Sequence, residues 1–201
     1  MKLKHYYFVL SGIVLMSGMG LLLLSCETGV EISPEPGILR ITLQSDPSDT
    51  FIVVINDTFT VSAGDSFAVT ISQGKVYHDD NFAILFTAIE SNDFEGTYNI
   101  LERVNSTYKK YTIYESYVPP NNYNTLQFVA NARLVKLKYF RIPVQLPPDA
   151  EPLLNFDYDF QLFENKVTEI NMQISPFRSV TRYRDSYYFS REMQIVGTTY
   201  Y

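Results

Sequence analysis

The chain has 201 residues, a length that suits one folded domain with a sizeable core rather than two. Its 22 acidic residues outnumber its 16 lysines and arginines, which argues against a general nucleic-acid binder, because such proteins present basic surfaces to phosphates. A single cysteine excludes an internal disulfide, and 16 tyrosines and 14 phenylalanines beside many β-branched residues favour half-buried strands.

The N-terminus has the layout of a secretory signal. Lys2 and Lys4 form a short positive region, and residues 7 to 24 form an apolar run without a charge. The sequence Leu-Leu-Ser-Cys at residues 23 to 26 places the only cysteine where this run ends, directly after a small residue. The segment resembles the lipobox of bacterial lipoproteins, whose signal is cleaved before the cysteine and whose thiol and new amino group are acylated.

This resemblance implies cleavage of residues 1–25 between Ser25 and Cys26, and a lipid on Cys26. Two or three acyl chains, at about 0.8 kcal/mol per buried methylene, hold a protein firmly on a bilayer. The alternative is an uncleaved anchor, because about 18 apolar residues reach the lower limit for a transmembrane helix. Either version exports the rest of the chain. We expect attachment to a bacterial outer membrane, on its periplasmic or surface face, ahead of the inner membrane.

Residues 26–37 read as a lipidated, flexible tether, because acids, prolines and glycines stand there without apolar periodicity. A single domain is predicted over residues 38–201, built from short alternating runs typical of strands. They are Ile38 to Gln44, Phe51 to Ile55, Phe59 to Ser62, Phe67 to Ser72, Phe82 to Ile89, Tyr98 to Val104, Tyr108 to Tyr117, Leu126 to Ala130, Leu134 to Leu146, Phe156 to Phe163, Val167 to Ile174 and Tyr187 to Val196.

Turn signals separate these runs. Asp46 to Asp49, Ala63 to Asp65, Gln73 to Lys75 and Glu95-Gly96 favour turns, and Asn56-Asp57 predicts a two-residue hairpin turn. Residues 119 to 124, with two prolines and three asparagines, predict an exposed loop. The regular spacing of short strands indicates an all-β fold, namely an antiparallel β-sandwich or barrel.

Two segments resemble uncharacterised bacterial lipoproteins whose exported domain is a transthyretin-like or prealbumin-like β-sandwich. The first, Gly37 to Pro47, is similar to their opening strand, which runs through alternating apolar residues to an Asp and a Pro. The second, residues 142 to 180, is similar to their closing pattern of a strand, a hairpin with the polar turn Glu164-Asn165-Lys166, and a strand at Val167 to Ile174. The resemblance implies a fold and a location, and it transfers no catalytic residues.

Two patterns offer candidate catalytic chemistry. His78 lies beside two aspartates, and a hydrolase triad needs a histidine, although a solvated loop has the same composition. Asp157 and Asp159 stand two apart, so on a strand both carboxylates share one face while three aromatic residues share the other. Paired carboxylates suit glycosidic acid and base catalysis, but a strand with one face in water produces the same pattern.

Two further patterns concern ligands. Asp79, Asp80 and Asn81, with Asp93 and Glu95, supply oxygens that Ca²⁺ accepts, but no loop has the ligand spacing of a calcium site. We therefore predict neither a metal nor a cofactor. A basic stripe (Arg133, Lys136, Lys138 and Arg141) suits anionic headgroups or polysaccharide, and equally protects an exposed sheet from aggregation.

Tyrosines mark the candidate ligand surface, because their rings offer an apolar face and a polar tip to sugars or protein partners. The candidates crowd the middle of the chain at Tyr108, Tyr111, Tyr114, Tyr117 and Tyr123. The sequence thus predicts a non-enzymatic, membrane-anchored envelope lipoprotein that binds an envelope protein or polysaccharide, and no nucleic acid. The alternatives are an envelope hydrolase using paired carboxylates and a calcium-stabilised adhesin-like domain.

Overall fold

The computed structural model describes residues 33–54, 57–88 and 96–201, so the predicted signal, Ser25 and Cys26 lie outside the described residues. The folded unit runs from Pro34 to Tyr201. Its described residues form strands and turns without a helix, which confirms the all-β prediction. None of the described segments is a helix long and apolar enough to cross a membrane.

The first sheet has four strands in the order β16-β13-β1-β9. Their bounds are β1 Gly37–Ser45, β9 Tyr111–Val118, β13 Val167–Ile174 and β16 Met193–Tyr200. Alternation explains β1, where Leu39, Ile41 and Leu43 are buried while Arg40 and Gln44 point outward. The expected strands over residues 38 to 44 and 167 to 174 are therefore confirmed.

The second sheet follows the order β14-β15-β11-β10-β4-β5, and β12 pairs with β10 while β6 pairs with β4. Tyr114 of β9 and Phe128 of β10 pack across the two sheets with ring centroids 6.3 Å apart, so both sheets share one core. The bounds are β4 Ser66–His78, β5 Asn81–Ile84, β6 Thr97–Asn99, β10 Asn122–Leu137, β11 Phe140–Gln145, β12 Leu153–Gln161, β14 Val180–Tyr183 and β15 Ser186–Phe189.

Two small hairpins complete the described strands. They pair β2 Phe51–Val54 with β3 Asp57–Thr60, and β7 Arg103–Val104 with β8 Thr107–Tyr108. The expected turn at Asn56-Asp57 is wrong at Asp57, because Asp57 already pairs with Val54 as a strand residue. Asn56 lies outside the described residues.

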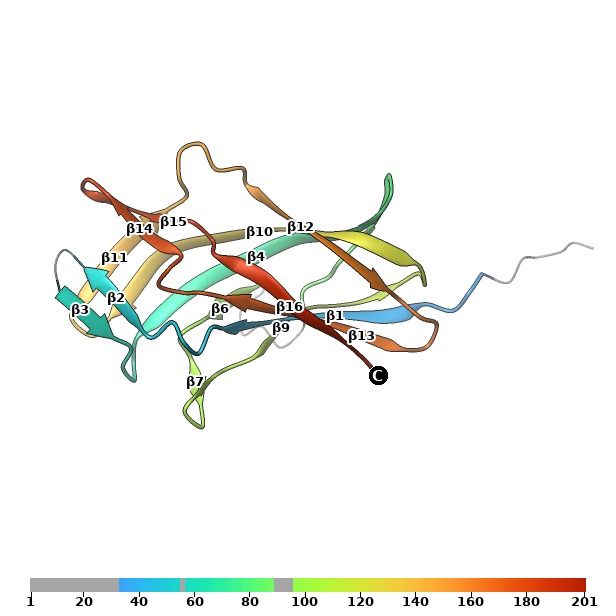
Figure 1. Ribbon diagram of the computed structural model, residues 1–201, viewed down its shortest axis with the longest axis horizontal. Helices are drawn as coiled ribbons and strands as arrows, with labels where there is room; N and C mark the ends of the chain where they lie inside the picture. The colour runs from blue at the N-terminus through green and yellow to red at the C-terminus, as the bar shows by residue number, and fades with distance from the viewer. Residues whose placement is uncertain (1–32, 55–56, 89–95) are drawn as a thin grey trace, which may run out of the picture. The chain divides into compact units, whose positions relative to one another are not determined.

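The sheets are not purely antiparallel, which corrects the expected fold class. β1 pairs parallel with β13, and β11 pairs parallel with β15. Parallel neighbours need a long crossover connection, and β1 and β13 have most of the domain between them. Figure 1 shows β1 and β13 side by side. Alternation within a strand carries no information about this pairing.

The expected turn at Gln73 to Lys75 is also wrong, because β4 continues through it. The register against β10 shifts between Gln127 and Val129, and Gln73 takes a φ of 57°, so these residues form a bulge in the strand. A glycine is required at position 74 because the ring of Tyr114 packs closely against its Cα. A Cβ at this position would lie 2.6 Å from Cζ of Tyr114.

The expected hairpin between β12 and β13 is wrong as well. Its turn forms, with Asn165 at a φ of 54° and the N–H of Lys166 donating to the carbonyl of Phe163 at 3.4 Å. However, β12 pairs with β10 of the second sheet, whereas β13 lies between β1 and β16 of the first. The turn therefore carries the chain from one sheet to the other.

The loop expected over residues 119 to 124 is shorter than predicted, because Asn122 and Tyr123 already pair with β12. Residues 81 to 88 join the sheets at one edge. The N–H of Leu85 donates to Gly74 of β4 at 2.8 Å, and the N–H of Ala88 donates to Ile113 of β9 at 3.2 Å.

Candidate functional site

A groove of about 520 Å³ lies where β4, β12 and β16 end and β10 begins. Strand register brings these segments together, since Asn122 pairs with Gln161 and Tyr123 with Phe160. The lining residues are His78, Asp79, Asn122, Tyr123, Asn124, Asp159, Phe160, Gln161 and Tyr200.

Two stacked aromatic rings form the apolar part of this groove. Tyr123 and Phe160 are buried, with ring centroids 5.5 Å apart and planes 19° from parallel. The hydroxyl of Tyr123 donates to the carbonyl of Pro119 at 2.8 Å, and burial raises its pKa. Tyr123 is therefore a neutral, fixed side chain that supports the groove. The exposed ring of Tyr200 lines the same groove from β16.

The polar part of the groove is set by His78. Its Nδ1 lies 2.7 Å from the carbonyl oxygen of Asn122, so Nδ1 carries the proton and donates. Its Nε2 lies 3.6 Å from a carboxylate oxygen of Asp79. The amides of Asn124 and Gln161 and the carboxylate of Asp159 add donors and acceptors to the exposed rim, the arrangement that recognises a ligand with many hydroxyls.

No serine, threonine, cysteine or lysine occurs among the described residues that line this groove. Within the described lining, His78 therefore has no serine, threonine or cysteine beside it to act as the nucleophile of a triad. His78 and Asp159, both candidates from their sequence patterns, line one groove. Asp157 lies elsewhere, opposite Thr125 on the outer face of the second sheet.

The alternation expected around the two aspartates is confirmed. Asp157 and Asp159 are exposed, while Phe156 stacks on Phe128 with ring centroids 5.3 Å apart and Phe160 is buried. The core thus accounts for the aromatic side of β12.

The five tyrosines proposed as a ligand surface do not form one surface. Tyr108, Tyr114 and Tyr123 are buried and Tyr111 is half-buried, so Tyr117 alone of the five is exposed. They belong to the core because β9 turns its inner face toward the second sheet, and a bulge between the partners of Ile41 and Thr42 brings Ile113 inward beside Tyr114. Tyrosine content signalled strand structure here rather than a binding site.

The basic stripe is exposed as expected. Lys136 of β10 pairs directly with Arg141 of β11, and Arg133 and Lys138 are also exposed. Arg133 also lines a hollow of about 410 Å³ with Ala68, Thr70, Asn131 and Leu134. Like charges directly opposite each other repel, so this end of the sheet suits an anionic neighbour or simply water.

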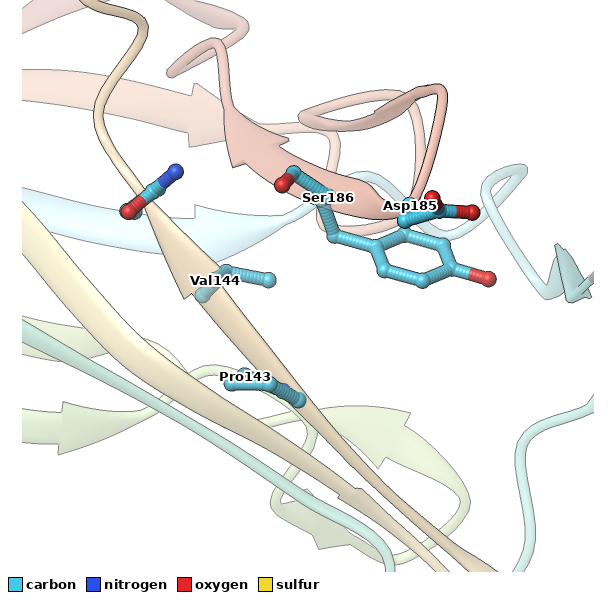
Figure 2. A pocket seen from close by; sticks show the side chains of 6 residues that line it. Pro143, Val144, Asp185 and Ser186 are labelled. Carbon is cyan, nitrogen blue, oxygen red and sulfur yellow. The ribbon is translucent and has the colours of Figure 1, made fainter.

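A small pocket of about 240 Å³, which no sequence pattern predicted, lies beside the parallel pair of β11 and β15. Figure 2 shows Pro143 and Val144 on β11 facing Asp185 and Ser186 at the start of β15. Gln145 and Tyr187 complete its lining. No signal in the sequence could have indicated it, since it depends on a parallel pairing between distant segments.

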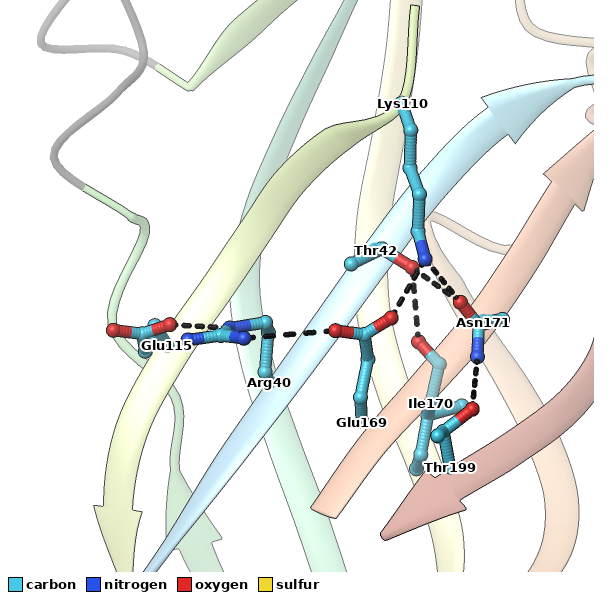
Figure 3. A network of polar contacts seen from close by, with 8 residues as sticks. All are labelled: Arg40, Thr42, Lys110, Glu115, Glu169, Ile170, Asn171 and Thr199. Atoms are coloured by element: carbon cyan, nitrogen blue, oxygen red, sulfur yellow. Dashed lines mark hydrogen bonds and ion pairs between the residues drawn. The ribbon is translucent and has the colours of Figure 1, made fainter. Parts of the chain in front are cut away.

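A network of charges on the outer face of the first sheet was also missed (Figure 3). Arg40 of β1 lies 2.5 Å from Glu115 on β9 and 3.6 Å from Glu169 on β13. The hydrogen bond that Arg40 donates to Glu115, together with the charges of Glu115 and Glu169, raises the pKa of Arg40. Lys110 contacts Glu169 at 2.6 Å and Asn171 at 2.6 Å. Glu169, with 8% of its side chain exposed, is thus held by two cations.

No group of three or more histidines, cysteines, aspartates or glutamates gathers as a metal site within residues 33–54, 57–88 and 96–201. Asp93 and Glu95, which the calcium alternative requires, lie outside these ranges. Comparison with protein-family models, with curated proteins and with solved structures found no match.

Proposed function

We propose that this chain is a bacterial envelope lipoprotein whose exported domain, a transthyretin-like β-sandwich, binds a ligand without catalysis. The main support for the lipid anchor is the position of Cys26. This residue is the only cysteine, and it stands where the apolar run of residues 7 to 24 gives way to a polar segment. A lipid on Cys26 holds the domain at the outer membrane through the tether that ends at Gly37.

The groove supports a binding role for the domain. Its amides and carboxylates are hydrogen-bonding groups on an exposed rim, and the exposed ring of Tyr200 offers a flat face above the buried Tyr123. Aromatic faces and amide groups together suit the hydroxyls and apolar patches of sugar rings. We therefore propose an envelope polysaccharide as the ligand class.

Mass spectrometry of the protein purified from bacterial membranes tests the anchor. We expect an N-terminal Cys26 that carries diacylglycerol and an amide-linked acyl chain. Cys26→Ser should retain residues 1–25 because it has no thiol to alkylate. An unmodified thiol with Met1 still attached to the wild-type chain would show that the anchor is wrong.

Binding to purified cell-wall polysaccharide tests the ligand class. Tyr200→Ala and Gln161→Ala should each weaken binding about tenfold, which corresponds to roughly 1.4 kcal/mol. Tyr139→Ala is the matched control, because Tyr139 is exposed in the turn between β10 and β11 and lines no part of the groove. Unaltered binding by both groove variants would refute the groove as the site. Binding only to an envelope protein would refute the polysaccharide.

A further inference from the structure

One row of side chains on the outer face of the first sheet is apolar from edge to edge. Ile38 of β1 pairs with Tyr117 of β9 on one side and with Val167 of β13 on the other. Val167 and Tyr201 exchange both backbone hydrogen bonds, at 2.9 and 3.3 Å. We name Tyr117, Ile38, Val167 and Tyr201 the apolar row. Tyr117 is 76% exposed and Tyr201 is 63% exposed, at its two ends.

The apolar character does not extend into the neighbouring row. Two residues further along the strands, the next row of outward-facing side chains is charged. In that row Arg40 pairs with Glu115 and Glu169, and Glu169 pairs with Thr199. In this network two cations, Arg40 and Lys110, face two anions, so the charges balance. A surface that contacts the apolar row therefore meets no net charge from this neighbouring network.

The apolar row lies where the tether enters the domain. Gly37, the first residue of β1, pairs with Val118, and the N–H of Ile38 donates to the carbonyl of Lys166 at 2.9 Å. Cys26 stands 11 residues before Gly37. Such a segment spans at most about 40 Å when fully extended, so a lipid on Cys26 keeps a bilayer within reach of this row.

We propose that the apolar row is a membrane contact, with the phospholipid headgroup interface of the anchoring bilayer as its occupant. Tyrosine rings prefer this interface because they have an apolar body and a polar tip. Ile38 and Val167, half-buried between the two tyrosines, extend the apolar strip. The proposal rests on the proposed lipid anchor, since a single row of four side chains binds membranes weakly by itself.

The absence of tryptophan from the chain allows a direct test. Tyr117→Trp and Tyr201→Trp each place one fluorophore in the apolar row, and Tyr139→Trp is the matched control with 73% exposure. The control lies at the other end of the domain, because β10 begins just after β9 and runs 16 residues, about 50 Å, before Tyr139. Figure 1 shows β11, which follows Tyr139, on the side away from the start of β1.

The lipidated full chains are reconstituted in vesicles of phosphatidylethanolamine and phosphatidylglycerol, with and without brominated acyl chains. Both row variants should show blue-shifted emission that brominated lipid quenches at least twofold more than in Tyr139→Trp. If mass spectrometry confirms acylation and the row variants are quenched no more than the control, the membrane contact is wrong while the anchor stands.

Two other outcomes are equally decisive. Quenching of Tyr117→Trp without quenching of Tyr201→Trp would refute the row as one contact surface. If Cys26 is found unmodified, the anchor proposal fails. The membrane contact then fails with it, because four side chains bind a membrane only weakly without a lipid anchor.

Discussion

Tyr114 occupies the centre of the core, where its hydroxyl has no partner among the described residues. The side chain is fully buried between the sheets, with Phe128 across from it and Gly74 against its ring. Among the described residues no hydrogen-bond partner reaches its hydroxyl oxygen. Burial raises the pKa of Tyr114, so the hydroxyl stays neutral and its lost hydration is not compensated.

Tyr114→Phe should therefore stabilise the domain. A buried hydroxyl without a partner costs about 1 to 3 kcal/mol, and the variant removes that cost. Losing one oxygen also leaves a small void, which offsets part of the gain. We expect a net rise of about 1 kcal/mol in the free energy of unfolding. For the domain of residues 34 to 201 this raises Tm by roughly 2 to 4 °C.

Urea unfolding followed by circular dichroism measures this change. Tyr111→Phe is the control, because the hydroxyl of Tyr111 lies 2.5 Å from the carboxylate of Glu102 and 2.9 Å from the carbonyl of Asn99. Removing this charge-assisted hydrogen bond should cost about 1.5 to 3 kcal/mol. A loss of stability in Tyr114→Phe as large as in the control would contradict the reasoning, since it would mean that the buried hydroxyl is bonded in solution.

Three more predictions concern stability. Gly74→Ala should lower the free energy of unfolding by about 1 to 3 kcal/mol, because its Cβ would lie 2.6 Å from the ring of Tyr114; an unchanged urea midpoint would disprove the close approach. Asp49→Ala should cost about 2 kcal/mol in the same assay, because its buried carboxylate accepts two backbone N–H groups at 2.7 and 3.1 Å. The Ser48 hydroxyl lowers the pKa of Asp46, so this carboxylate stabilises the fold above pH 3.8 and the stability is lost as pH falls through the lowered value. Ser48→Ala should reduce that loss in acid unfolding curves.

The faces of the strands were predictable from the sequence, whereas their partners were not. Apolar residues recur at every second position from Leu39 to Leu43 in β1 and from Ile170 to Ile174 in β13, which indicates a buried face. Nothing in that alternation specifies that the two strands are parallel neighbours, since the pairing depends on contacts between segments more than 100 residues apart. Gly74 illustrates the same limit. A glycine after Gln73 is compatible with a turn or a bulge, and only the ring of Tyr114 decides between them.

The candidate site was predictable only in part, and for the same reason. His78 and Asp159 stood out as titratable residues, but their common groove arises because β4 and β12 flank β10 in one sheet. For the five tyrosines, the sequence predicted one ligand surface, whereas most of them are buried. Aromatic residues favour strands and cores as strongly as they favour binding surfaces, so composition alone could not separate Tyr117 from Tyr114.

The two proposals together determine how the domain would stand on a membrane. A flexible tether alone leaves every face of a domain free to meet the bilayer, whereas contacts beside the tether restrict the domain to one orientation. Tyr200 and Tyr201 are consecutive in the chain, and Tyr200 lines the groove while Tyr201 ends the apolar row. A domain that rests on the row would therefore hold the groove close to the membrane. Its ligand should then be a polysaccharide that lies at the membrane surface rather than one that is freely diffusing.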